Sequence, residues 1–303
     1  MKKISIVIPA YNEQNNIAAL YKEIQNTLKN NEFECIFIDD GSTDNTFDEI
    51  KKLSEHNKQV KGISFSRNFG HQIALFAGLK ETSGDVVIML DADGQHPPRL
   101  IPELIKKHKE GFDIVNTKRI STENTSFTKK ITSKLYYFII NSLADIKIEN
   151  ASSDFRLMNR KATDAFLKIE EKDRFTRGLV SWIGFKQTVI EYQAPKRSFG
   201  KSKYTFRKML RLAWDGITSF SSRPLKLSFY IGIFSLIFGV LYSFYALMAH
   251  FSGKTIQGWT STIIIILLLG GFQLLSIGII GEYLSRIFNE AKNRPHYFIK
   301  DRC

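Results

Sequence analysis

The sequence has only two cysteines among its 303 residues, and neither has a partner at the spacing of a metal-binding or redox pair. Secreted domains held by disulfides and zinc-binding modules carry their cysteines in closely spaced sets. The scarcity therefore argues against both classes. Two isolated thiols, Cys35 within an apolar segment and Cys303 at the end, are compatible with a reducing compartment such as the cytoplasm.

Acidic residues are the next shortage. The chain has 30 Asp and Glu against 43 Lys and Arg, which gives a formal net charge of +13. Such a charge can indicate a nucleic-acid-binding protein, but the sequence has no zinc-finger spacing or other nucleic-acid motif. Instead, nine basic residues and one acid lie between Lys196 and Lys226, directly before an apolar segment. Anionic lipid headgroups are therefore the expected partner, and nucleic acid is not.

Two long segments lack charged residues altogether, Leu227–Ala249 and Thr255–Gly281. A helix of about 23 residues reaches roughly 35 Å, enough to cross a hydrocarbon core of about 30 Å. Two helices buried in a soluble core are the alternative. The link between the segments, His250–Thr260, carries one full charge, Lys254, whereas basic residues flank the outer ends. The positive-inside rule therefore predicts a multi-pass protein of the plasma membrane with both termini in the cytoplasm.

What the chain does have is a series of apolar runs that end abruptly in polar residues. Three of them lie in Lys3–Glu13, Glu34–Thr46 and Val86–Pro98, and helical stretches, Asn16–Lys29 and Asn45–Ser54, follow the first two. Alternating strands and helices predict an α/β fold with a parallel sheet. Ligands bind such sheets at the carboxyl ends of the strands, which is where the polar residues lie.

The third run ends in Asp91-Ala92-Asp93, followed two residues later by Gln95. Carboxylate oxygens are the ligands that Mg²⁺ and Mn²⁺ prefer when the ion also binds substrate phosphates. Because residues two apart on an extended chain point the same way, the two carboxylates are expected to converge at the strand end. Solvated acids in a turn are the alternative. His96 is either a further ligand or a polar turn residue.

These three motifs, in this order and each at a strand end, resemble those of the family-2 inverting glycosyltransferases of GT-A fold. The resemblance implies a metal at Asp91, Asp93 and Gln95, with Asp93 the first choice of ligand. For Asp39 and Asp40, the acids that end the second run, a turn-forming or helix-capping role is the alternative. Asp44 is expected to be a cap. The resemblance also implies a nucleotide site formed by Pro9, Tyr11, Glu13, Asp39, Asp40 and Arg67.

Further segments narrow the resemblance to the polyprenyl-phosphate glycosyltransferases, which include dolichyl-phosphate mannose synthases and bacterial undecaprenyl-phosphate glucosyltransferases. They are Ser66–Gly78, Ser152–Arg160 and Lys196–Gly216, together with the two apolar segments. This similarity implies inverting transfer of one sugar, expected to come from a UDP-hexose, to undecaprenyl phosphate at the cytoplasmic face. Gly94, His96, Ser153 and Asn159 depart from the residues common in the family, so the identity of the sugar stays open.

The resemblance also implies an acceptor side, where cations must bind a phosphate that carries nearly two negative charges. Asp154 is the candidate general base, and Asp93, the first choice of metal ligand, is the other catalytic residue. Because a phosphate is already mostly ionised at pH 7, positioning of the acceptor is an equally good role for Asp154. Each basic residue has a solvated surface charge as its alternative. The residues implied to bind the acceptor or the diphosphate are Arg119, Lys129, Ser133, Arg156, Arg197, Ser202 and Lys203.

The expected organisation is a GT-A (Rossmann-like) α/β catalytic domain followed by a two-helix transmembrane hairpin. Its parts are a catalytic domain over 1–203, an amphipathic juxtamembrane segment over 204–226, a hairpin over 227–284 with helices at about 227–249 and 260–284, and a basic tail over 285–303. The hairpin could also join copies of the chain into a homo-oligomer.

Two other functions share parts of this pattern. A processive polysaccharide synthase usually adds a Q-x-x-R-W signature and more membrane helices, and the sequence has neither. A non-catalytic nucleotide-sugar-binding scaffold would be expected to lose D-x-D or Asp154, which are both present.

Overall fold

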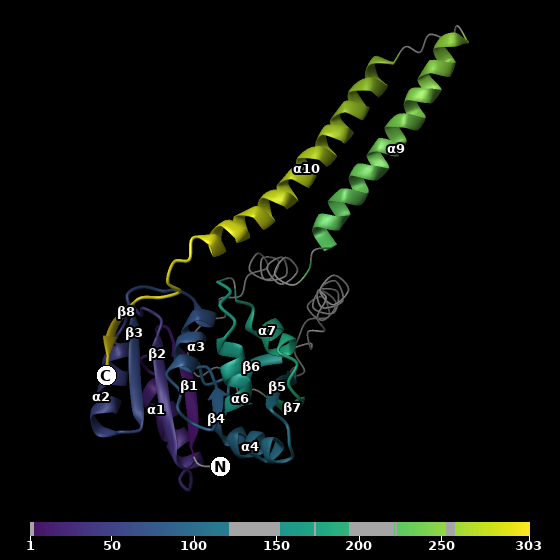
Figure 1. Ribbon diagram of the computed structural model, residues 1–303. Helices are drawn as coiled ribbons and strands as arrows, with labels where there is room; N and C mark the ends of the chain where they lie inside the picture. Colours follow the sequence, from purple (N-terminus) through teal and green to yellow (C-terminus); the bar gives the residue numbers. More distant parts are fainter. Residues whose placement is uncertain (1–2, 121–151, 173, 194–220, 222, 253–257) are drawn as a thin grey trace.

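The computed structural model describes residues 3–120, 152–172, 174–193, 221, 223–252 and 258–303. Within them, eight strands form one sheet in the order β7-β5-β6-β4-β1-β2-β3-β8 (Figure 1). The strands are β1 (Ile4–Ala10), β2 (Phe33–Asp39), β3 (Val60–Phe65), β4 (Val86–Met89), β5 (Ile114–Ile120), β6 (Ser152–Asn159), β7 (Gln187–Gln193) and β8 (Ile299–Arg302).

Helices cover both faces of the sheet. One face packs against α1 (Ile17–Thr27), α2 (Thr46–His56) and α4 (Ile101–Lys109), which follows a short turn of 3-10 helix, η1 (Pro98–Leu100). The other packs against α3 (His71–Lys80), α6 (Arg160–Leu167) and α7 (Thr176–Trp182). Burial on both faces explains why β1, β2 and β4 are continuous apolar runs rather than alternating ones.

Strand direction decides where the polar residues meet. β1, β2, β3 and β4 are parallel, so their carboxyl ends share one edge. β6 runs antiparallel to β4, with Met89 opposite Arg156, so β6 begins where β4 ends. Two segments far apart in the sequence, one around Asp91 and one around Asp154, therefore lie side by side at this edge.

Close packing of α3 fixes the elements around this edge. A Cβ on Gly78 would lie 2.3 Å from Cγ1 of Val7, so the helix sits directly on β1. Gly41, at the end of β2, has a φ of +68°, and a Cβ there would lie 2.3 Å from the main-chain carbonyl carbon of Arg67. Only glycine allows the loop after β2 to approach the loop before α3 this closely.

Two long apolar helices project away from the sheet, α9 (Arg223–Phe251) and α10 (Trp259–Ala291) (Figure 1). Segments 223–249 and 268–291 are long and apolar enough to cross a membrane and are unburied in the single chain. The helices extend beyond the predicted spans, because residues 223–226, expected in the juxtamembrane segment, form the first turn of α9. Residues 204–220 of that segment lie outside the described part of the chain.

The segment after the hairpin differs from the expected basic tail. α10 continues to Ala291, and the chain then returns to the sheet, where β8 pairs antiparallel with β3. The ring of Tyr297 stacks on Phe65 with 4.8 Å between centroids, and the guanidinium of Arg302 binds the carboxylate of Glu81. The sequence predicted a basic tail over 285–303, whereas main-chain pairing makes Ile299–Arg302 the outer strand of the sheet.

Candidate active site

Asp91 lies directly beyond β4, and its Oδ1 atom is 3.5 Å from Nε2 of His71. Its main-chain N–H donates to Nδ1 of His96 at 2.9 Å, which holds the turn together. Its carboxylate atom Oδ1 is buried and accepts no hydrogen bond from any described residue. A buried, unsatisfied acceptor is costly unless a ligand completes it. This atom therefore suits a bound cation.

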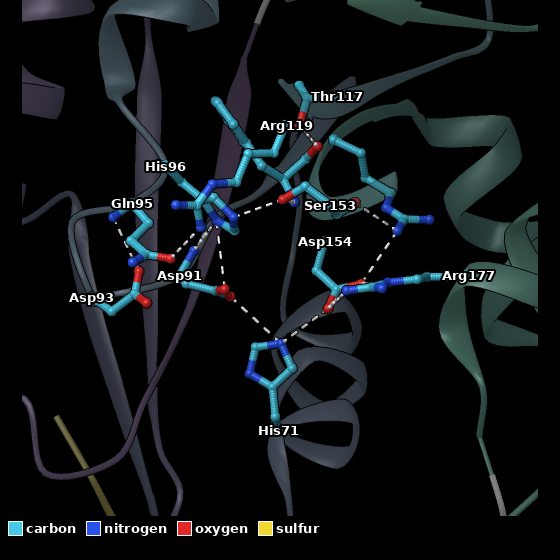
Figure 2. A network of polar contacts seen from close by, with 12 residues as sticks. His71, Asp91, Asp93, Gln95, His96, Thr117, Arg119, Ser153, Asp154 and Arg177 are labelled. Atoms are coloured by element: carbon cyan, nitrogen blue, oxygen red, sulfur yellow. Dashed lines mark hydrogen bonds and ion pairs between the residues drawn. The ribbon is translucent and has the colours of Figure 1, made fainter. Parts of the chain in front are cut away.

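Asp93 and Gln95 lie in the turn that follows. Oδ1 of Asp93 accepts from the main-chain N–H of Gln95 at 3.0 Å, and Oε1 of Gln95 accepts from Nη1 of Arg119 at 3.1 Å. Contrary to expectation, Asp91 and Asp93 do not lie on an extended chain, because β4 ends at Met89 and Gly94 turns the chain with a φ of +73°. Their joint binding of a metal stays a prediction. Figure 2 shows Asp93 beside Gln95, with Asp91 facing His71.

His96 links the two sides of the site. Because Nδ1 accepts from Asp91, the proton is on Nε2, which lies 2.7 Å from Oγ of Ser153 and donates to it. The ring is 6% exposed and stacks on Phe155 with 5.3 Å between centroids. Both nitrogens are therefore engaged within the protein. This geometry supports the turn-residue interpretation rather than metal ligation.

Asp154 lies across from Asp91 among basic side chains (Figure 2). Nη2 of Arg156 is 3.3 Å and Nε of Arg177 is 3.4 Å from its Oδ1, and Nε2 of His71 is 3.6 Å from its Oδ2. Burial favours the neutral acid, but the charges of Arg177, His71 and Arg156 outweigh it and hold the pKa of Asp154 well below its usual range. The carboxylate is therefore ionised at neutral pH and is a weak base.

Asp39 and Asp40, the acids after β2, are 2% and 3% exposed. Asp39 accepts from the main-chain N–H of Ser42 and from Oγ of Ser64, at 3.1 and 2.6 Å. Asp40 accepts from the main-chain N–H groups of Phe69 and Gly70, the shortest at 2.7 Å, while burial raises its pKa. Both carboxylates organise loops, as the turn-forming alternative expected. Contact with a nucleotide stays a prediction.

The other residues expected around the nucleotide surround the same edge. Pro9 is buried in β1, Tyr11 is 38% exposed and Glu13 is half-buried. Arg67 is exposed, with its guanidinium 4.1 Å from the ring centroid of Phe69. Outside this set, Asp44 accepts from the main-chain N–H of Thr46 at 3.0 Å at the start of α2, close to the expected capping role.

The acceptor-side residues divide into three groups. Arg156 is 1% exposed and donates to the main-chain carbonyl of Ser153 at 3.0 Å, so it is buried beside Asp154 rather than open to a ligand. Arg119 lies at the rim, bound to Gln95. The remaining predicted residues lie outside the described part of the chain: Lys129, Ser133, Arg197, Ser202 and Lys203.

The donor atoms fit a hard divalent cation. Among the described residues, no three His, Cys, Asp or Glu side chains gather as a complete metal cage. Mg²⁺ and Mn²⁺ do not need one, because one or two carboxylates suffice when substrate phosphates and water fill the other positions. The carboxylates of Asp91 and Asp93, two residues apart in the turn beyond β4, provide such a partial set, and Oδ1 of Asp91 accepts no hydrogen bond from a described residue.

Comparison with known proteins identifies the family. Residues 5–167, more than half of the chain, match glycosyl transferase family 2. The chain belongs to this family. Its mixed sheet confirms the expected GT-A-like α/β class of this family-2 glycosyltransferase, and residues 223–287 match the GtrB C-terminal hairpin.

Relatives of this family-2 glycosyltransferase match over nearly the whole chain. It is 45% identical over 300 residues to the uncharacterized glycosyltransferase YkcC of Bacillus subtilis (strain 168), covering 98% of this chain and 93% of the relative. It is 41% identical over 303 residues to a bactoprenol glucosyl transferase of Shigella phage SfX, covering 99% of each. A glucosyl-3-phosphoglycerate synthase from Mycobacterium tuberculosis is 20% identical, with a TM-score of 0.47, covering 72% of this chain and 78% of the other.

Two residues of this family-2 glycosyltransferase were not predicted to be in the site. His71 lies between Asp91 and Asp154, and Arg177 reaches Asp154 from α7. His71 lies in Ser66–Gly78, one of the segments that resemble the family, but no motif in the sequence indicated a role for its side chain. Arg177 stands in a stretch with no recognisable motif, and only the packing of α7 beside β6 brings it to the site.

Proposed function

We propose that the protein transfers one sugar from a nucleotide sugar to a polyprenyl phosphate, with inversion at the anomeric carbon. The observation that carries this proposal is the meeting of the acids beyond β4 with Asp154 and Arg177 at one edge of the sheet. The donor diphosphate and the anionic acceptor must bind on facing sides of one site, and this edge has both sides. Relatives that match over the whole chain are named bactoprenol glucosyl transferases, and bactoprenol is a polyprenol.

On the donor side, Asp91 and Asp93 would hold a divalent ion, Mg²⁺ or Mn²⁺, against the diphosphate, with Gln95 beside them. Bound there, the ion would neutralise the charge that grows on the leaving nucleoside diphosphate. Arg119, bound to Gln95 at the rim, adds positive charge near the same position. The donor is expected to be a UDP-hexose.

On the acceptor side, Arg177 is the described cation best placed to bind a phosphate. Its side chain is 29% exposed and lies beside Asp154, whereas that of Arg156 is 1% exposed. A phosphate oxygen attacks the anomeric carbon while the bond to the nucleoside diphosphate breaks. The acceptor phosphate, with its second pKa near about 6, arrives mostly ionised at pH 7. The low pKa of Asp154 therefore supports a positioning role over proton abstraction.

The site is expected to face the cytoplasm, where nucleotide sugars are available. Lys254 is the only full charge in the link between the membrane helices, and basic residues flank their other ends. Ser252→Cys, in a Cys303→Ser background, should react with an impermeant thiol reagent added outside intact cells. Lys292→Cys in the same background should not. The opposite labelling pattern would place the catalytic domain outside and would refute the proposal.

The decisive experiment offers the purified full-length protein a panel of nucleotide sugars together with undecaprenyl phosphate. Mass spectrometry should find a lipid that carries one sugar, formed from one or a few donors. A polymer would indicate a processive synthase. Binding of a nucleotide sugar without any product would indicate a scaffold, and either result would refute the proposal.

A further inference from the structure

The position of His71 is fixed by the loop that precedes it. It is the first residue of α3, and Gly70 before it has a φ of +106°. The carboxylate of Asp40 accepts from the main-chain N–H groups of Phe69 and Gly70. The next turn begins with the main-chain N–H of Ala74 donating to the carbonyl of Gly70 at 3.1 Å. The imidazole is therefore carried on a short, braced segment.

Its Nε2 atom lies between carboxylates that belong to opposite halves of the site. The distance is 3.5 Å to Oδ1 of Asp91 and 3.6 Å to Oδ2 of Asp154. Figure 2 shows the ring below the two acids, with a dashed line from it to each. Oδ1 of Asp91 is the buried atom that accepts no hydrogen bond from a described residue. His71 is thus the described group closest to completing it.

Two facing carboxylates repel each other unless a donor or a cation lies between them. Arg156 and Arg177 both compensate Asp154, with nitrogens 3.3 and 3.4 Å from its Oδ1. Nε2 of His71 lies 3.5 and 3.6 Å from a carboxylate oxygen of each acid, so it is placed as a donor between them.

We propose that His71 is a positioning residue, which holds the acceptor-side carboxylate Asp154 at a fixed distance from the donor-side carboxylate Asp91. This inference rests on the proposed function, because it assigns the two acids to the two substrates. His71 touches neither the leaving group nor the acceptor. It sets the gap across which the phosphate oxygen must approach the anomeric carbon, and misplacement by about 1 Å can cost a hundredfold in rate.

The first test separates positioning from packing by its kinetics. His71→Ala should lower kcat for glycolipid formation about 10- to 100-fold. The KM for the nucleotide sugar should stay within about threefold of its original value. His71→Gln, whose amide nitrogen occupies the place of Nε2, should recover several-fold of the loss. His108→Ala is the matched control, because His108 is also a half-buried helical histidine, bound to the carbonyl of Phe112.

The second test needs no activity and uses the full-length protein in detergent. His71→Ala should lower the apparent melting temperature by about 2–4 °C. In an Asp91→Asn background the same substitution should cost less than half as much, because one of the facing charges is already gone. His108→Ala should have the same effect in both backgrounds.

The outcomes are separable. Unchanged kcat in His71→Ala, equal kcat in His71→Ala and His71→Gln, or an identical thermal effect in both backgrounds would each overturn the role of His71. Absence of any glycolipid from the unmodified protein would instead refute the proposed function. The thermal comparison would then still decide whether His71 links the two acids.

Discussion

Glu34 and Asp91 lie at opposite ends of the parallel strands, and the protein binds their carboxylates in different ways. Near the amino end of β2, Glu34 is 2% exposed and both of its oxygens are bonded. Oε1 accepts from Ser5 and Ser83, and Oε2 lies 3.1 Å from Nζ of Lys3 and 3.0 Å from Nζ of Lys61. At the carboxyl end, Oδ1 of Asp91 has no hydrogen bond from a described residue.

The difference separates a structural acid from a functional one. Glu34 is complete without a ligand, and the hydrogen bonds and charges of its neighbours offset the effect of burial and lower its pKa to about 2. Asp91, at the other end, is only partly compensated by the described residues, which leaves capacity for a cation. Substitutions at the two ends should therefore change different quantities: folding stability at one and turnover at the other.

The largest effect is expected from Asp93→Asn. Losing the negative charge of one carboxylate from the proposed metal site should lower turnover by about a hundredfold or more. Removal of a main group that stabilises charge in the transition state has an effect of this size. The rate of glycolipid formation measures this, and excess EDTA should abolish activity of the unmodified protein. Asp164→Asn, at an exposed acid of α6, is the control. Full activity in EDTA would remove the metal from the proposal.

Asp154→Asn should have a somewhat smaller effect, about 10- to 100-fold on turnover, with much of it in the apparent affinity for lipid phosphate. Because its pKa lies well below the usual range, Asp154 has no proton to gain or lose near neutral pH. The pH profile of the variant should therefore keep its shape at lower height. A limb of the profile that disappears in Asp154→Asn, with unchanged lipid affinity, would establish proton abstraction instead.

Glu34→Gln should change stability and leave turnover per folded molecule unaltered. Each pH unit of displacement is worth about 1.4 kcal/mol, so lowering the pKa of Glu34 from 4.5 to about 2 contributes about 3 kcal/mol. That contribution is fully present above pH 4.5 and is lost as the pH falls through about 2. Denaturant unfolding from pH 6 to pH 2 should show a steeper loss in the unmodified protein than in the variant. Equal slopes would contradict this role.

The smallest effect is expected at the outer strand. Arg302 and Glu81 form an ion pair at 3.0 Å, but their side chains are 55% and 29% exposed, so water and salt weaken it. Arg302→Ala should lower the free energy of unfolding by no more than about 1 kcal/mol. Denaturant unfolding at low and high salt would measure it. A larger loss would show that β8 depends on side-chain contacts rather than on its main-chain pairing with β3.

The sequence predicted the parts of the sheet whose signal is local. Apolar runs that end in acids identified β1, β2 and β4, and the expected helices over 16–29 and 45–54 correspond to α1 and α2. The charge-free segments identified α9 and α10. Each of these patterns lies within a single element and depends on its own burial.

Features that depend on neighbours in space were not predictable in the same way. All four residues of β8 are exposed and three of them are charged, so its own sequence does not favour a strand, and its pairing with β3 makes it one. His71 and Arg177 join the site because α3 and α7 pack beside the edge that carries Asp91 and Asp154. The turn at Gly94 was missed because the spacing of Asp91 and Asp93 is equally compatible with an extended chain and a turn.

The return of the chain to β8 also imposes an order on biosynthesis. In the chain, β3 precedes α9 and α10, and β8 follows them. The ribosome therefore completes both long apolar helices before it makes the strand that pairs with β3. During that interval, the N-terminal part of the domain can fold, but its sheet has an open edge at β3. The sheet is closed only when the segment after α10 pairs with it. Completion of the catalytic domain is therefore coupled to synthesis of the hairpin.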